Sequence, residues 1–123
     1  MKLNHFYEVQ SKSLEGEEML HFKVALHKEH SIFKGHFPDH PVLPGVAMLQ
    51  MVTDLLEDHL SVTLRLQSVH RAKFVGLVNP NVSNVLQFAL LFQREDNRLI
   101  VKNSTTFVDQ TRVMDCQIHY AIT

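Results

Sequence analysis

One segment of the sequence, residues 46–60, constrains the fold more than any other part of the chain. It follows Pro44-Gly45, contains no proline or glycine and ends in polar residues, a pattern that predicts a helix. Its first two turns are almost entirely apolar, so the helix must be buried on most of its sides. A single polar stripe interrupts this surface at Gln50, Asp54, Glu57 and Asp58. Of these, we expect Glu57 and Asp58 to lie on a solvated face.

Apolar residues alternate with polar ones on both sides of this helix, which predicts strands. Residues 20–26 form one such segment, and a short strand at residues 4–9 is expected ahead of it. After the helix, strands are predicted at residues 62–74, 85–93, 99–108 and 114–122. The short connections favour antiparallel pairing. The sequence therefore predicts an α+β fold in which one antiparallel sheet of about six strands wraps around a central buried helix.

Length and charge limit the classes of protein to consider. The 123 residues predict a single domain, residues 1–123. The formal net charge is −1, which gives no electrostatic case for binding nucleic acid or an anionic membrane surface. The sequence shows no apolar run of the length of a signal peptide or a membrane span. Cys116 is the one cysteine, so no disulfide within the chain is expected, and we expect a cytoplasmic protein.

The loop at residues 28–45 is unusual because Pro38, Pro41 and Pro44 recur in it at every third position. This spacing stiffens the backbone in an extended conformation and would hold a neighbouring side chain still. His36, which lies between Gly35 and Phe37, is the best candidate for that side chain. A histidine is able to act as a general base at neutral pH.

The loop leads into the predicted helix without a Ser, Thr, Asp or Asn to cap it. The backbone N–H groups of Gly45 and Val46 therefore lack an expected side-chain partner. Such donors at the positive end of a helix dipole are suited to bind a developing oxyanion. A base and an oxyanion site together match the removal of a proton next to a thioester carbonyl, which is a hypothesis at this point.

Metal binding is the competing interpretation, because the chain has nine histidines. His27, His30, His36 and His40 lie close together in the sequence. Pro38 stands between the last two and prevents helical i, i+4 pairing, and the segment has no cysteine or His-x-His spacing. We therefore expect no metal site, and we expect Cys116 to be an inert core residue.

The segment Gly35-His36-Phe37-Pro38-x-x-Pro41-Val42-x-Pro44-Gly45-Val46 resembles the active-site signature of the 3-hydroxyacyl-acyl-carrier-protein dehydratases, the FabZ and FabA group with the hotdog fold. Residues 72–80 resemble the Lys-Phe-x-x-x-Val-x-Pro strand and turn of the same family. The order of predicted elements agrees over nearly the whole chain.

The resemblance implies a homo-oligomer, at least a dimer, with the acyl chain in a tunnel at the dimer interface. Phe33, Phe37 and Pro44 are expected to line this tunnel. The family implies that His36 removes the C2 proton, and that the Gly45 amide, beside that of Val46, holds the thioester carbonyl. It implies no cofactor of the protein's own, because phosphopantetheine arrives with the substrate. The implied partner is an acyl carrier protein that carries a 3-hydroxyacyl chain; Lys34, Arg71 and Lys73 are candidate contacts for it.

The sequence departs from the family at the acid. Fourteen positions after the histidine the family has Glu or Asp, which acts from the helix of the partner subunit and assists departure of the C3 hydroxyl, whereas this chain has Gln50. A carboxamide forms hydrogen bonds but donates no acidic proton. Asp54 lies one helical turn further on the same face, where FabZ-type enzymes typically carry Gln, so the pair looks exchanged.

Three accounts fit this departure. Asp54 supplies the acid directly or through a water, His36 performs both proton transfers, or dehydration is lost. The expected function is that of a (3R)-hydroxyacyl-acyl-carrier-protein dehydratase-like lyase of fatty-acid or polyene-type biosynthesis, which forms a trans-2-enoyl thioester. The alternatives are a hotdog acyl thioesterase and a non-catalytic acyl-thioester-binding subunit.

Overall fold

The structure is a computed structural model that describes residues 6–30, 33 and 43–123. Within these residues the secondary-structure elements follow the predicted order, with two strands, one helix and four strands. They are β1 (Tyr7–Glu15), β2 (Met19–Leu26), α1 (Gly45–Leu60), β3 (Leu64–Phe74), β4 (Val85–Glu95), β5 (Arg98–Phe107) and β6 (Arg112–Ile122).

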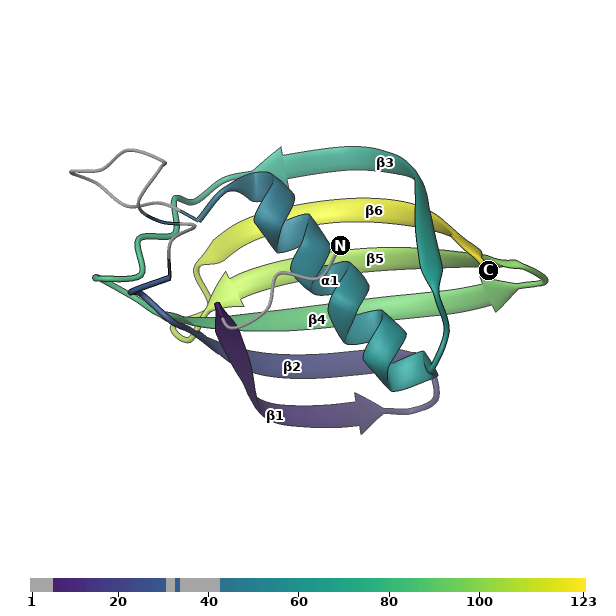
Figure 1. Cartoon of the computed structure of the whole chain (residues 1–123), viewed down its shortest axis with the longest axis horizontal. Helices are drawn as coiled ribbons and strands as arrows, with labels where there is room; N and C mark the ends of the chain where they lie inside the picture. Colours follow the sequence, from purple (N-terminus) through teal and green to yellow (C-terminus); the bar gives the residue numbers. More distant parts are fainter. Residues whose placement is uncertain (1–5, 31–32, 34–42) are drawn as a thin grey trace.

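The strands form one six-stranded sheet in the order β1-β2-β4-β5-β6-β3. Each neighbouring pair is antiparallel. Figure 1 shows α1 lying across one face of this curved sheet. The arrangement confirms the predicted α+β class and is that of the hotdog fold.

The core lies between α1 and the sheet face that it covers. Every second side chain of the central strands points to this face, as in β4 with Leu86, Phe88, Leu90 and Phe92. The helix contributes buried residues from most of its circumference: Ala47, Met48, Met51, Val52, Asp54, Leu55 and Leu56. The prediction of a buried helix is therefore confirmed for these residues, but Val46, one of the apolar residues of the first turn, is 77% exposed.

The prediction for the first strand is wrong in extent. A strand is predicted at residues 4–9, of which residues 1–5 lie outside the described part, whereas β1 continues to Glu15. β1 is an edge strand, and nearly all of its side chains are exposed. A strand without a buried face shows no two-residue alternation, so periodicity could not reveal its length.

The other edge of the sheet is β3, and its outer side has no strand next to it in the described chain. Its pairing with β6 shifts register between Leu66 and Ser68 and again between His70 and Lys73. Arg71 lies within the second shift and has a positive φ of 53°. Such a bulge bends an edge strand and changes the direction of its side chains.

Candidate active site

The start of α1 carries no side-chain cap. Pro44 occupies the N-cap position with an extended backbone, φ −63° and ψ 144°. Ala47 N and Met48 N donate hydrogen bonds to the Pro44 carbonyl oxygen at 3.0 and 3.2 Å. The N–H groups of Gly45 and Val46 lie ahead of these bonds, at the positive end of the helix dipole. Two backbone donors thus lie where the sequence predicts an oxyanion site.

The first helical residue, Gly45, packs closely against the ring of Phe74. A Cβ atom on Gly45 would lie 2.8 Å from Cε1 of Phe74, at the end of β3, which is too close for two carbon atoms. Just ahead of the helix, Leu43 is buried and donates its N–H to the Val78 carbonyl oxygen at 2.8 Å. The described part of the first family-like segment, residues 43–46, therefore contacts the second one, residues 72–80.

A groove of about 330 Å³ runs along α1, between the helix and strands β3 and β6. Its apolar lining comes from Val46, Leu49, Leu64, Leu66 and Ile118, and its polar lining from Gln50, Thr53, Glu57 and Tyr120. The groove begins at the uncapped end of the helix, and its lining combines five apolar side chains with four polar ones. These features suit an acyl chain whose thioester lies near the first helical amides.

The structure brings Gln50 and Asp54 together, as their spacing predicts. Gln50 Nε2 donates a hydrogen bond to Asp54 Oδ1 at 2.9 Å. Gln50 is half-buried and lines the groove, whereas Asp54 is only 3% exposed and does not line it. The amide therefore faces the groove, with the carboxylate behind it.

Thr53 and Tyr120 line the same groove and are not predicted from the sequence as site residues. The Thr53 hydroxyl contacts the Tyr120 hydroxyl at 2.8 Å and donates a hydrogen bond to the Leu49 carbonyl oxygen at 3.1 Å. Burial raises the pKa of Tyr120 well above its ordinary value, so its hydroxyl stays protonated. The available signal is the position of Thr53, which is one turn after Gln50 on the helix.

Asp58 is exposed, as expected for a solvated helix face. Glu57 is not, because it is half-buried and its Oε2 accepts a hydrogen bond from Leu64 N at 2.8 Å. The helical pattern alone does not show that the chain turns back at Ser61 and brings Leu64 to this carboxylate. The prediction for Glu57 is therefore corrected.

Two of the remaining predicted site residues, His36 and Phe37, lie outside the described residues, as does Lys34. Phe33 is described, and it packs in the hydrophobic core, with its role in a tunnel still a prediction. Cys116 is buried, as predicted, and burial raises the pKa of its thiol. Among the described residues, no group of three or more His, Cys, Asp or Glu side chains could hold a metal ion.

A second hollow, of about 540 Å³, lies where β3 bulges away from β6. Four cationic residues line it, namely Arg71, Lys73, Lys102 and Arg112. Asp115 is the acidic residue in its lining, and it forms an ion pair with Arg112. This hollow therefore has a positive excess, although the whole chain carries a formal charge of −1.

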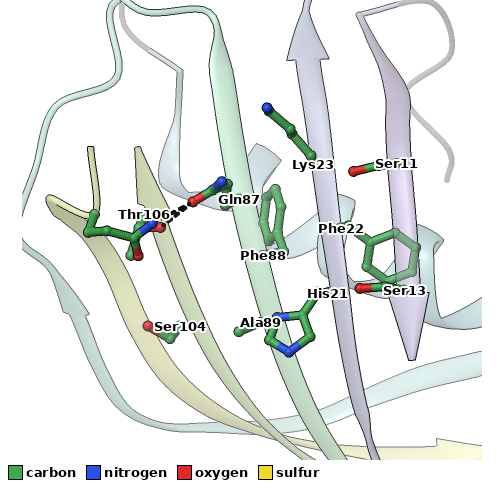
Figure 2. A pocket seen from close by; sticks show the side chains of 11 residues that line it. Ser11, Ser13, His21, Phe22, Lys23, Gln87, Phe88, Ala89, Ser104 and Thr106 are labelled. Atoms are coloured by element: carbon green, nitrogen blue, oxygen red, sulfur yellow. Dashed lines mark hydrogen bonds between the residues drawn. The ribbon is translucent and has the colours of Figure 1, made fainter. Parts of the chain in front are cut away.

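A third hollow opens on the sheet face opposite to α1, where Figure 2 shows His21, Lys23 and Gln87 on neighbouring strands. These residues alternate with buried ones such as Phe22 and Phe88, so they point away from the core. Gln87 Oε1 accepts hydrogen bonds from Thr106 and Gln110, and His21 pairs with Glu15. These polar contacts are typical of a sheet face that is exposed to solvent.

No helix within the described residues is long and apolar enough to cross a membrane.

Comparison with solved structures shows the same fold. A chain of the dehydratase heterocomplex ApeI:P from Xenorhabdus doucetiae has a TM-score of 0.75 at 21% identity, covering 93% of this chain and 96% of that one. A hypothetical thioesterase with coenzyme A from Streptococcus pneumoniae TIGR4 has a TM-score of 0.67 at 9% identity, covering 95% and 85%. These identities are low, so the two likenesses show the fold alone.

Comparison of sequences goes further. The chain is 26% identical over 101 residues to the 3-hydroxyacyl-[acyl-carrier-protein] dehydratase FabZ of Sulfurimonas denitrificans. The match covers 72% of this chain and spans 66% of the length of that relative. The family model described as ApeI-like, ApeI dehydratase, matches residues 11–112, well over half of the sequence. The chain therefore belongs to the ApeI-like dehydratase family, as its similarity to FabZ-type enzymes predicts.

Proposed function

We propose that the protein is a (3R)-hydroxyacyl-acyl-carrier-protein dehydratase-like lyase, which forms a trans-2-enoyl thioester in fatty-acid or polyene-type biosynthesis. The observation that carries the proposal is the uncapped start of α1, whose first amides lie at one end of a groove lined by both apolar and polar side chains. Family membership supports the reaction class. The proposed setting is the cytoplasm, with no cofactor beyond the phosphopantetheine of the substrate.

In the proposed mechanism, His36 removes a proton from C2 while the amides of Gly45 and Val46 stabilise negative charge on the thioester oxygen. The electron pair of the C2–H bond forms the C2–C3 double bond. The C3–O bond breaks, and its electron pair leaves with the hydroxyl oxygen. That oxygen takes one proton and departs as water. If the imidazolium of His36 supplies this proton, the histidine returns to its neutral state.

The central experiment gives the full chain a 3-hydroxyacyl carrier protein and follows enoyl product and free thiol separately. We expect enoyl product from the wild type and its loss in His36→Ala. Free thiol without enoyl product would instead identify a thioesterase. Formation of neither product would indicate a non-catalytic acyl-binding subunit, an alternative that Gln50 favours because it replaces the acid of the family.

The positive hollow supports an acyl carrier protein as the partner. A chain with a formal charge of −1 does not attract an acidic protein through its net charge, so a local cationic surface is needed. Arg71, Lys73, Lys102 and Arg112 provide one on strands β3, β5 and β6. Lys102→Glu is expected to lower kcat/KM for a carrier-bound substrate several-fold at low salt. The same substitution should leave kcat/KM for a small thioester unchanged, with Lys28→Glu, outside the hollow, as the control.

The exposed edge of β3 supports a homo-oligomer, at least a dimer. Leu66 and Phe74 on this strand are both 50% exposed, and the outer backbone groups of an edge strand are free to pair with a second chain. Pairing of two β3 edges would extend the sheet across two copies. Light scattering after size-exclusion chromatography is expected to give at least twice the chain mass. A purely monomeric protein would contradict this part of the proposal.

A further inference from the structure

The Gln50–Asp54 pair has a defined orientation because its two side chains differ in hydrogen-bonding capacity. An ionised carboxylate accepts hydrogen bonds and donates none, whereas a carboxamide has a donor end and an acceptor end. The 2.9 Å contact to Asp54 Oδ1 therefore requires the nitrogen of Gln50 to face Asp54. The carbonyl oxygen Oε1 is then directed away from Asp54, and Gln50 is the member of the pair that lines the groove.

The neighbouring polar groups of the groove have partners of their own. Thr53 and Tyr120 share a hydrogen bond, and Glu57 accepts one from Leu64 N. The bond to Asp54 uses one N–H of Gln50 and leaves the acceptor capacity of its carbonyl oxygen. Gln50 is thus a groove residue whose carbonyl oxygen is able to accept a hydrogen bond from a ligand, and the Glu57 carboxylate, of which Leu64 N engages only Oε2, is the competing acceptor.

We propose that Asp54 is a positioning residue, which holds the Gln50 carboxamide so that Oε1 accepts a hydrogen bond from the 3-hydroxyl of the acyl chain. This inference rests on the proposed function and chooses among the three accounts of the missing acid. Asp54 does not reach the substrate, and Gln50 cannot protonate it. The hydroxyl donates a hydrogen bond to Gln50 Oε1 and keeps its proton, so the lone pairs on its oxygen remain available. The imidazolium of His36 then supplies the proton with which water departs.

The test compares a 3-hydroxyacyl pantetheine thioester with its saturated counterpart, which lacks the hydroxyl. We expect Asp54→Asn to weaken binding of the 3-hydroxy compound by about threefold to tenfold, the range of one neutral hydrogen bond, and to leave the saturated compound unaffected. Asparagine can present either end of its amide to Gln50, so the orientation is lost. Asp58→Asn, which removes the same charge from the exposed face of the same helix, is the matched control.

A double-mutant cycle separates positioning from acid catalysis. If Asp54 acts through Gln50, Asp54→Asn has no further effect on the hydroxyl preference in a Gln50→Ala background. A loss of the same size in that background would overturn the proposal. So would removal by Asp54→Asn of a limb in the pH profile of kcat, because a proton donor and not a positioning residue produces such a limb.

Two further measurements distinguish a failure of folding, or of the proposed function, from a failure of this inference. If Asp54→Asn lowers the melting temperature too far for binding measurements, Gln50→Met keeps the chain length of the side chain and removes the amide. Gln50→Met should abolish the preference for the 3-hydroxy compound over the saturated compound and leave binding of the saturated compound unchanged. If no enoyl product forms but the wild type still prefers the 3-hydroxy compound, the proposed function fails and this inference stands. Equal binding of both compounds, or binding of neither, overturns the inference.

Discussion

The two ends of α1 satisfy their backbone groups in opposite ways. At the first turn, Pro44 offers no side-chain cap, and the amides of Gly45 and Val46 precede the first helical bonds. At the last turn, Ser61 adopts the left-handed conformation, with φ 55°, and donates its N–H to the Glu57 carbonyl oxygen at 2.9 Å. The Glu57 side chain also accepts the N–H of Leu64, the first residue of β3.

This difference separates stability from function within one helix. A buried helix end normally gains stability when side chains or turns bind its unpaired groups. Residues 57–64 do this, whereas the helix start at residues 44–46 has no side-chain cap and lies next to the groove. Natural proteins often give up stability at the place where they bind ligands. In the proposed mechanism, these uncapped amides bind the thioester oxygen, and this assignment is what the following variants test.

A side-chain cap at the first turn is expected to have the largest effect, because it would remove the difference between the two helix ends. In Pro44→Asp, the new carboxylate would accept the amide of Val46 and place negative charge beside Gly45. We expect a loss of at least about tenfold in kcat, because oxyanion donors contribute strongly to the barrier. The helix should gain about 1 kcal/mol relative to Pro44→Ala, which removes proline without adding a cap. Enoyl formation and urea unfolding measure the two effects.

Equal activity of Pro44→Asp and Pro44→Ala would show that the first amides take no part in the reaction. The alanine variant is the needed reference, because proline also restricts the unfolded chain.

Glu57→Ala tests the opposite end. It removes the acceptor of Leu64 N in a partly buried position, and we expect a loss of about 1–3 kcal/mol in the free energy of unfolding. Asp58→Ala changes the neighbouring exposed acid and serves as the control, with an effect within about 0.5 kcal/mol. Equal losses in the two variants would mean that the Glu57–Leu64 bond does not stabilise the turn.

Ser61→Gly is expected to stabilise the last turn of α1 and to leave the first turn unchanged. A non-glycine residue in the left-handed region is strained, and glycine relieves this strain at the expense of greater freedom in the unfolded chain. We expect a net gain of about 0.5 kcal/mol in unfolding free energy with enoyl formation unchanged. A gain accompanied by lost activity would contradict the separation of the two ends.

Most of the fold is predictable from the sequence because burial imposes a period. β2, β4 and β6 have one buried face, and their alternation places them within a few residues. β1 has no buried face, so its extent depends on pairing with β2, which no local pattern reveals.

The site residues also differ in how far local sequence patterns predict them. Gln50 and Asp54 are predictable as a pair because helical spacing is local. The sequence does not predict which of the two side chains faces the groove, because this depends on how the helix packs against the sheet. The positive hollow combines Arg71 and Lys73 with Lys102 and Arg112 only once the register of three strands and a bulge is known.

The smallest expected effect concerns His59, in the last turn of α1. Partial burial lowers its pKa below the ordinary value, and the charge of Lys12 adds to this shift. Lys12 Nζ lies 3.4 Å from His59 Nδ1, so the neutral imidazole is able to accept a hydrogen bond from the ammonium group. A histidine whose pKa is lowered in the folded state takes up a proton more readily when unfolded. Its contribution to stability is therefore present above about pH 6.5 and lost as the pH falls below that value.

Urea unfolding at pH 8 and at pH 5.5 measures this loss in the wild type and in His59→Gln. We expect the variant to lose slightly less stability on acidification, since glutamine does not titrate. Lys12→Gln should reduce the same difference, because it removes the second cause of the shift while leaving the imidazole in place. The effect should be small because His59 is mostly solvated and exposed charges are screened. A larger loss in His59→Gln than in the wild type would reverse the sign of this argument and show that protonated His59 stabilises the end of the helix through its dipole.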